Sequence, residues 1–136
     1  MFNSSKLASW FKRLQPEVTA PMHTPTYVPV RFALCFHTLE IGCLTLSADG
    51  EWQFAYTEAF LAQALVKPII GFPEVHKTYR NHQLWPFFSS RIPSADQPYV
   101  QFQARRKPLD LTDKAQMLKE FGHRTIANPF ALLAVG

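Results

Sequence analysis

The chain has 136 residues and a formal net charge of +4, and 47% of its residues are hydrophobic and 14% aromatic. This composition is too apolar for a disordered chain, and it suits one domain with a small core. No stretch reaches the roughly 20 apolar residues of a membrane-spanning helix, and the N-terminus lacks the continuous apolar run of a secretory signal. Two cysteines are too few for a disulfide framework, so we expect a cytoplasmic protein with no membrane contact.

Residues 1–27 are predicted to form an arm in front of a domain that spans residues 28–136. Four apolar residues have the i, i+3, i+4, i+7 spacing of an amphipathic helix, and basic residues lie elsewhere on the wheel: Leu7, Trp10, Phe11 and Leu14, with Lys6, Lys12 and Arg13. Regularly spaced prolines then favour an extended connector: Pro16, Pro21, Pro25 and Pro29. One interpretation is that this helix docks on a partner or on an anionic surface. The other is that it folds onto its own domain, or frays. A start at Met22 would make the arm optional.

The N-terminal half of the domain is predicted to form antiparallel strands. From Tyr27 to Phe36 apolar side chains alternate with period two, which is typical of a strand. Residues 39–47 are a second apolar run, and Asp49-Gly50 is a turn signal before an alternating segment, residues 51–56. This pattern predicts a β-hairpin whose second strand directs three aromatic side chains to one face: Trp52, Phe54 and Tyr56.

The remaining residues are predicted to be mainly helical. Thr57 can cap a helix that continues to Leu65, Ile69-Ile70 then returns to the sheet, and residues 75–79 form a short strand or loop. Helices are predicted at four places: from Pro86, over residues 98–107, from a Thr112 cap to Gly122, and from Asn128-Pro129 through Leu133. Strands followed by helices indicate an α+β fold, in which a small antiparallel sheet packs with a C-terminal set of short helices.

An ordered set of motifs resembles the N-terminal subdomain of HipA-type protein kinases. The motifs are Ile41-Gly42-x-Leu44, Asp49-Gly50-x-Trp52-x-Phe54-x-Tyr56, Ile70-Gly71-Phe72-Pro73, Pro86-Phe87-Phe88, Ile92-Pro93 and the final stretch from Asn128 to Gly136. Residues 89–95 depart from the family, which has Glu-Asn-Leu-Leu-Pro-Glu-Gly there, and the arm has no counterpart. In that family the kinase body follows the last glycine, so the chain resembles the subdomain made as a separate protein.

This resemblance implies a function as well as a fold. The chain is similar to the HipS component of three-part HipBST toxin–antitoxin modules, which implies a non-enzymatic antitoxin that binds and inhibits a separately encoded HipT-like Ser/Thr kinase toxin. A HipB-like helix-turn-helix protein is the implied DNA-binding component of the complex, so we expect no direct contact with nucleic acid. Two alternatives remain open. The chain could be an activating or assembly subunit of such a kinase, or a nucleic-acid-binding module that uses Arg105-Arg106-Lys107 and the basic arm.

The sequence contains no recognisable catalytic, metal or cofactor site. A kinase needs a phosphate-binding loop, a lysine and a catalytic aspartate, and the five scattered glycines offer no such loop. Cys35, His37 and Cys43 are one ligand short of a closed zinc site, so we interpret both cysteines as buried, free thiols. Ser89 and Ser90 could be phosphorylated or act as nucleophiles, but no base accompanies them, and residues at a helix start explain them equally well.

The predicted partner-binding residues lie around a tryptophan that precedes a proline. Trp85 follows a polar run, which indicates a surface position, and tryptophan is enriched among residues that dominate binding energy. The alternative is that Trp85 packs inside the core, as Trp52 is expected to do. The complete predicted partner-binding set is Trp85, Pro86, Phe87, Ser89 and Arg91.

Overall fold

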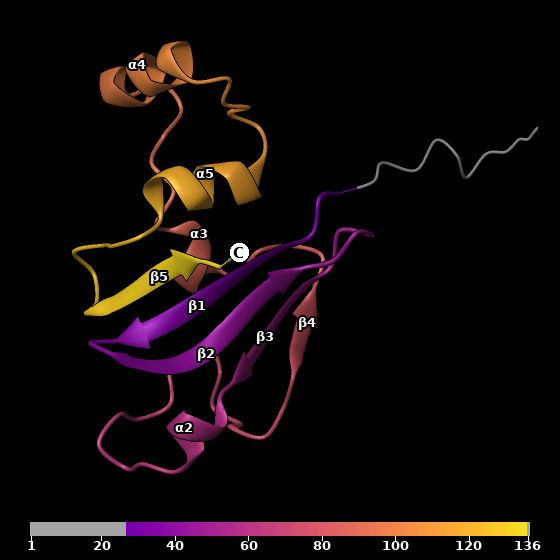
Figure 1. The fold of residues 1–136 in the computed structure, drawn as a ribbon, viewed down its shortest axis with the longest axis vertical. Helices are drawn as coiled ribbons and strands as arrows, with labels where there is room; N and C mark the ends of the chain where they lie inside the picture. Colours follow the sequence, from indigo (N-terminus) through magenta and orange to yellow (C-terminus); the bar gives the residue numbers. More distant parts are fainter. Residues whose placement is uncertain (1–26, 136) are drawn as a thin grey trace, which may run out of the picture.

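A computed structural model describes residues 27–135 of the chain, so the predicted arm lies outside the described residues except for Tyr27. The described residues form a five-stranded antiparallel sheet with the strand order β4-β3-β2-β1-β5 (Figure 1). The strands are β1 (Val30–Phe36), β2 (Leu39–Leu46), β3 (Trp52–Tyr56), β4 (Tyr79–Asn81) and β5 (Phe130–Ala134). Short helices follow the strands in the second half of the chain, so the predicted α+β fold is confirmed.

The predicted β-hairpin is confirmed as β2 and β3. Asp49-Gly50 lies in the connecting turn, where the Gly50 amide donates to the Ser47 carbonyl at 3.0 Å. Gly50 has a φ of +86°, a conformation that costs glycine little and other residues more. Strand β1 pairs with the other side of β2, from Val30↔Leu46 to Phe36↔Leu39. The meander therefore arises from local signals, namely period-two alternation and one strong turn.

The helices are shorter than expected but mostly in the predicted places. They are α2 (Glu58–Leu61), α3 (Pro86–Ser89), α4 (Pro98–Arg106) and α5 (Lys114–Phe121). Thr57 caps α2 as predicted, but this helix ends at Leu61 because the Gln63 side chain bonds to the backbone of Phe60 and Val66 and turns the chain. Helix α5 ends at Gly122 as predicted, but its cap is Asp113 and not Thr112. The Asp113 carboxylate accepts two backbone hydrogen bonds there, at 2.9 and 3.2 Å.

The prediction of a helix after Asn128-Pro129 was wrong, because this segment forms strand β5. It pairs with the free edge of β1, with Leu34 opposite Leu132. Leu132 is buried in the core, while Leu133 on the other side of the strand is exposed. Proline at the first helical position favours a helix locally, but the hydrogen bonds available along β1 outweigh this preference. The last strand of the chain therefore completes a sheet that the N-terminal half begins.

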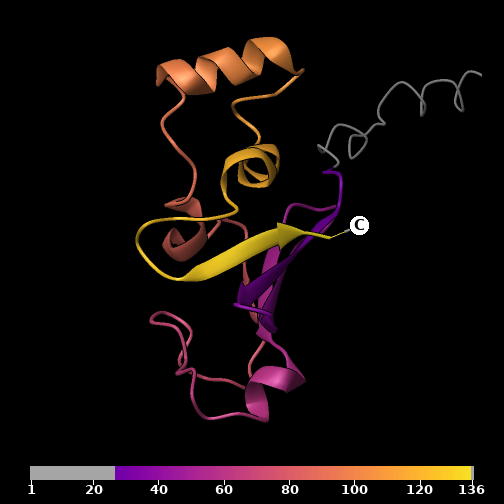
Figure 2. The ribbon, with the colours of Figure 1, turned by 60° about the vertical axis from the view of Figure 1, so that its left-hand side comes forward.

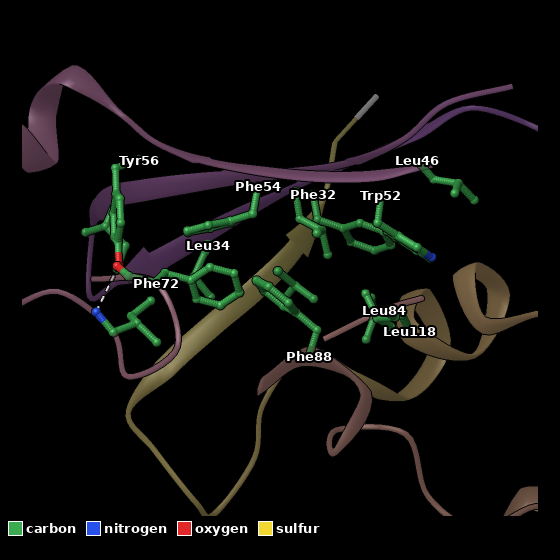
Figure 3. Close-up of a cluster of buried hydrophobic side chains, with 14 of the residues drawn as sticks. Phe32, Leu34, Leu46, Trp52, Phe54, Tyr56, Phe72, Leu84, Phe88 and Leu118 are labelled. Atoms are coloured by element: carbon green, nitrogen blue, oxygen red, sulfur yellow. Dashed lines mark hydrogen bonds between the residues drawn. The ribbon is translucent and has the colours of Figure 1, made fainter. Parts of the chain in front are cut away.

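The core lies between one face of the sheet and the segments that cover it (Figure 3). Trp52, Phe54 and Tyr56 all point into this core, as predicted. The Tyr56 hydroxyl donates to the Phe72 carbonyl at 2.7 Å and accepts from the Ile69 amide at 2.9 Å. The expected return of Ile69-Ile70 to the sheet was wrong. Tyr56 holds this segment as a turn, in which Ile69 is buried and Ile70 is 95% exposed.

We predict that Tyr56→Phe destabilises the protein by about 2 kcal/mol, because it leaves two buried backbone groups without a partner. Urea unfolding followed by circular dichroism measures this loss. Tyr99→Phe is the matched control, since Tyr99 is 52% exposed and its change should cost less than about 0.5 kcal/mol. Equal losses in the two variants would show that the Tyr56 hydroxyl does not hold the turn.

Candidate partner-binding surface

Helix α3 is a single turn that presents aromatic side chains at the surface. Trp85 precedes it in an extended conformation, and its carbonyl accepts hydrogen bonds from the amides of Phe88 and Ser89, both at 2.9 Å. Pro86 occupies the first helical position, where its missing amide hydrogen costs nothing. Backbone hydrogen bonds thus hold the turn, and the core residues on which it packs set the direction of its side chains.

Phe72 and Phe88 anchor this turn in the core. Phe88 is fully buried and packs against the rings of Phe54 and Phe72, at centroid distances of 5.6 and 6.0 Å. The Phe72 ring also receives Trp85 edge-on at 5.4 Å and Phe87 at 6.4 Å. Both of these outer aromatics are therefore fixed in orientation by contacts to one buried ring.

The structure places three of the five predicted residues together. Trp85 and Phe87 are partly buried on either side of the exposed Pro86, and we call these three residues the α3 surface. Trp85 is thus neither fully exposed nor a core residue like Trp52, because its ring packs on Phe72 and keeps part of its area accessible. Such a preordered aromatic can contact a partner with little loss of side-chain entropy. Its role in binding stays a prediction.

The predicted residue Arg91 points into the protein. Its side chain is 5% exposed, and its two terminal nitrogens donate to four oxygens, at 3.0 to 3.4 Å: Gly122 O, His123 O, Asn128 Oδ1 and Phe130 O. The guanidinium also lies over the Phe87 ring, at 5.5 Å. Burial lowers the pKa of this guanidinium, although arginine stays charged near neutral pH. Arg91 therefore connects the α3 surface to the end of α5 and to β5.

Ser89 lines a different feature, a cleft of about 670 Å³ between the β2–β3 turn and the start of α5. His82, Asp110 and Asp113 also line it, and no motif in the sequence indicates this cleft, because its lining comes from segments that are distant along the chain. The Asp113 carboxylate caps α5, and the Asp110 carboxylate accepts from the Thr112 amide at 2.9 Å and its hydroxyl at 2.7 Å, which lowers the pKa of Asp110. Within residues 27–135 no hydrogen bond joins Ser89 to a histidine or carboxylate, so the cleft presents no activated nucleophile.

The basic residues that follow Phe102 are partly engaged within the domain. The Lys107 ammonium lies 3.0 Å from a Glu120 carboxylate oxygen, and the Arg106 guanidinium lies over the Phe102 ring at 5.6 Å. Arg105 is exposed. The cluster therefore presents less free charge to nucleic acid than its sequence indicates.

Residues 27–135 contain neither a metal-binding cluster nor a membrane-spanning helix. Among them, no group of three or more histidine, cysteine or acidic side chains is placed to hold a metal ion. None of the helices in this described part is long and apolar enough to cross a membrane.

Comparison with protein families gives a match over residues 33–127 to the HipA N-terminal domain. The chain belongs to this family. No curated protein matches it significantly. The HipA N-terminal domain match begins within β1, includes β2, β3, β4, all four described helices and the α3 surface, and ends before β5. The final stretch from Asn128 to Gly136, which contributed to the resemblance, thus lies outside the matched range, and its family assignment stays a prediction.

We predict that Arg91→Met destabilises this HipA N-terminal domain by about 3 kcal/mol, because it removes a buried charged donor from four oxygen atoms. Hydrogen exchange of the β5 amides should accelerate most, since Arg91 holds the start of that strand. Arg124→Met, at an exposed position, is the control and should change little. If the two variants unfold at the same urea concentration, the Arg91 contacts contribute no net stability.

Proposed function

We propose that this HipA N-terminal domain protein is an antitoxin that binds a separately encoded HipT-like Ser/Thr kinase and inhibits it through the α3 surface. The observation that carries the proposal is membership of the HipA N-terminal domain family. In the HipA-type kinases that the sequence resembles, this domain accompanies a kinase body. A domain that packs against a kinase within one chain has a surface complementary to it. The same surface can act between two chains when the kinase is encoded separately.

The geometry of α3 supports the choice of surface. Trp85 and Phe87 are held by a buried ring and flank an exposed proline, so a partner meets a shaped apolar projection instead of mobile side chains. An aromatic anchor of this kind can contribute at least ~2 kcal/mol, which corresponds to about a 30-fold change in the dissociation constant. A HipB-like helix-turn-helix protein is the proposed third member of the complex and its DNA-binding component.

We predict that Pro86→Glu abolishes most kinase binding while the domain stays folded. Glutamate is tolerated at the first position of a helix, where negative charge is favourable, but it places a charge in the centre of the proposed apolar contact. Pro98→Glu is the matched control, because Pro98 is also an exposed proline at the start of a helix, in this case α4. Affinity for the purified kinase, measured by calorimetry, should fall by at least about 30-fold in the first variant only.

Trp85→Ala tests the anchor itself, and growth rescue on co-expression with the kinase reports inhibition. Because Trp85 also packs on Phe72, a circular dichroism melt must show that this variant is folded. A wild-type chain that neither binds the kinase nor restores growth would contradict the antitoxin proposal. Kinase activity that requires the chain would support the activating-subunit alternative instead. Equal binding by Pro86→Glu and Pro98→Glu would reject the α3 surface and leave the inhibitory function standing.

A further inference from the structure

The sheet has a second face that no described element covers. Figure 2 shows α3, α4 and α5 on one side of the sheet, where the core lies. On the opposite side, paired residues of four adjacent strands form one continuous apolar row, which we call the outer row. Its members, in order across β5, β1, β2 and β3, are Leu133, Ala33, Cys43 and Ala55. Leu133 is 39% exposed and Val135, two residues further along, is 44% exposed, whereas Ala33 within the row is 7% exposed and Cys43 and Ala55 are partly exposed.

This outer row is unusual for an antiparallel sheet. Where one face of such a sheet is solvated, its side chains are normally polar. The adjacent row fits that rule, since it contains Arg31, Thr45 and Gln53. The outer row does not fit this rule. The Arg31 side chain reaches from the adjacent row to the outer row, where its Nε donates a hydrogen bond to the Cys43 sulfur at 3.3 Å. An apolar row across four strands indicates a face built to be covered.

We propose that the occupant of this face is the chain's own N-terminal segment, residues 4–14, bound as an amphipathic helix. Its apolar stripe consists of large side chains: Leu7, Trp10, Phe11 and Leu14. The outer row consists of smaller side chains, and large side chains on a helix can pack closely against such a surface. The basic residues of the segment lie outside the stripe and would stay in water: Lys6, Lys12 and Arg13.

The length of the proposed helix matches the width of the outer row. A helix over residues 4–14 is about 16 Å long at 1.5 Å per residue. The outer row spans three strand-to-strand intervals, or about 14 Å at 4.8 Å each. One short helix laid across the strands therefore covers the row, without a second copy of the chain.

The attachment point of the arm also favours this occupant. The Tyr27 amide donates to the Ala48 carbonyl at 3.0 Å, and the Tyr27 ring packs so closely over Gly50 that a Cβ there would lie 2.5 Å from it. The arm thus enters at a fixed place beside the β2–β3 turn, about 20 Å along the extended chain from Ala33. The intervening residues 15–26 can span up to about 40 Å, so they can reach the outer face, and the short tether raises the effective concentration of the helix to the millimolar range.

Cys43 provides a direct measurement, because it is partly exposed in the middle of the outer row and would be covered by the docked helix. The test uses the full chain with Cys35→Ala, so that Cys43 is the remaining thiol, and measures its rate of reaction with a maleimide. Phe11→Asp places a charge in the apolar stripe. Lys12→Asp places the same charge on the neighbouring residue, outside the stripe.

We expect Phe11→Asp to increase the Cys43 labelling rate at least about tenfold, which corresponds to a segment docked for about 90% of the time, and Lys12→Asp to leave the rate unchanged. Two-dimensional NMR of the same variants should show shifts at the amides of Ala33, Ala55 and Leu133 for Phe11→Asp only.

Equal labelling rates in all three proteins would overturn the proposal. Protection that increases with protein concentration would assign the face to a second copy, and protection that appears only with the kinase would assign it to that partner. Either result would overturn docking of the arm.

Discussion

The buried guanidinium of Arg91 is the interaction on which the arrangement of the second half of the chain depends. It follows the end of α3 in the chain, and it donates to oxygens at the end of α5 and at the start of β5. A buried charge is costly unless it is fully compensated, and these acceptors supply that compensation for the terminal nitrogens. Its Nε has no partner among the described residues. Arg91 therefore ties the end of α3, whose outer aromatics Trp85 and Phe87 pack on Phe72, to the segments that follow it.

The same contact limits how the edge of the sheet can be used. Strand β5 is an edge strand, and unpaired backbone groups on such an edge invite pairing with other chains. The Arg91 guanidinium donates to the Phe130 carbonyl, and the Leu132 amide donates to the His123 carbonyl at 2.8 Å. Part of the backbone hydrogen-bonding capacity on the outward edge of β5 is therefore already satisfied. At the opposite edge β4 is only three residues long. Neither edge offers a long free strand. A partner is therefore expected to bind through side-chain contacts and not by adding a strand to the sheet.

The two surfaces proposed here for recognition, both within residues 27–135, lie on opposite sides of the sheet. The α3 surface is on the side that holds the core, and the outer row is on the other side. A partner bound through Trp85 therefore leaves the outer row free, and an arm docked on the outer row leaves α3 accessible. The two proposals are therefore compatible, because each uses a different side of the sheet. The proposed function of this HipA N-terminal domain therefore rests on such surfaces.

The sequence by itself determined the parts of the fold that depend on neighbouring residues. Period-two alternation and Asp49-Gly50 specify the β2–β3 hairpin, Thr57 caps α2, and Gly122 ends α5, because each of these signals acts within a few residues. The motif around Trp85 also located the candidate surface. Only the tertiary structure decided that residues 130–134 form a strand, since the helix signal of Asn128-Pro129 yields to pairing with the distant β1. It also decided that Arg91 points inward, because the oxygens that satisfy it come from segments that are close only after folding.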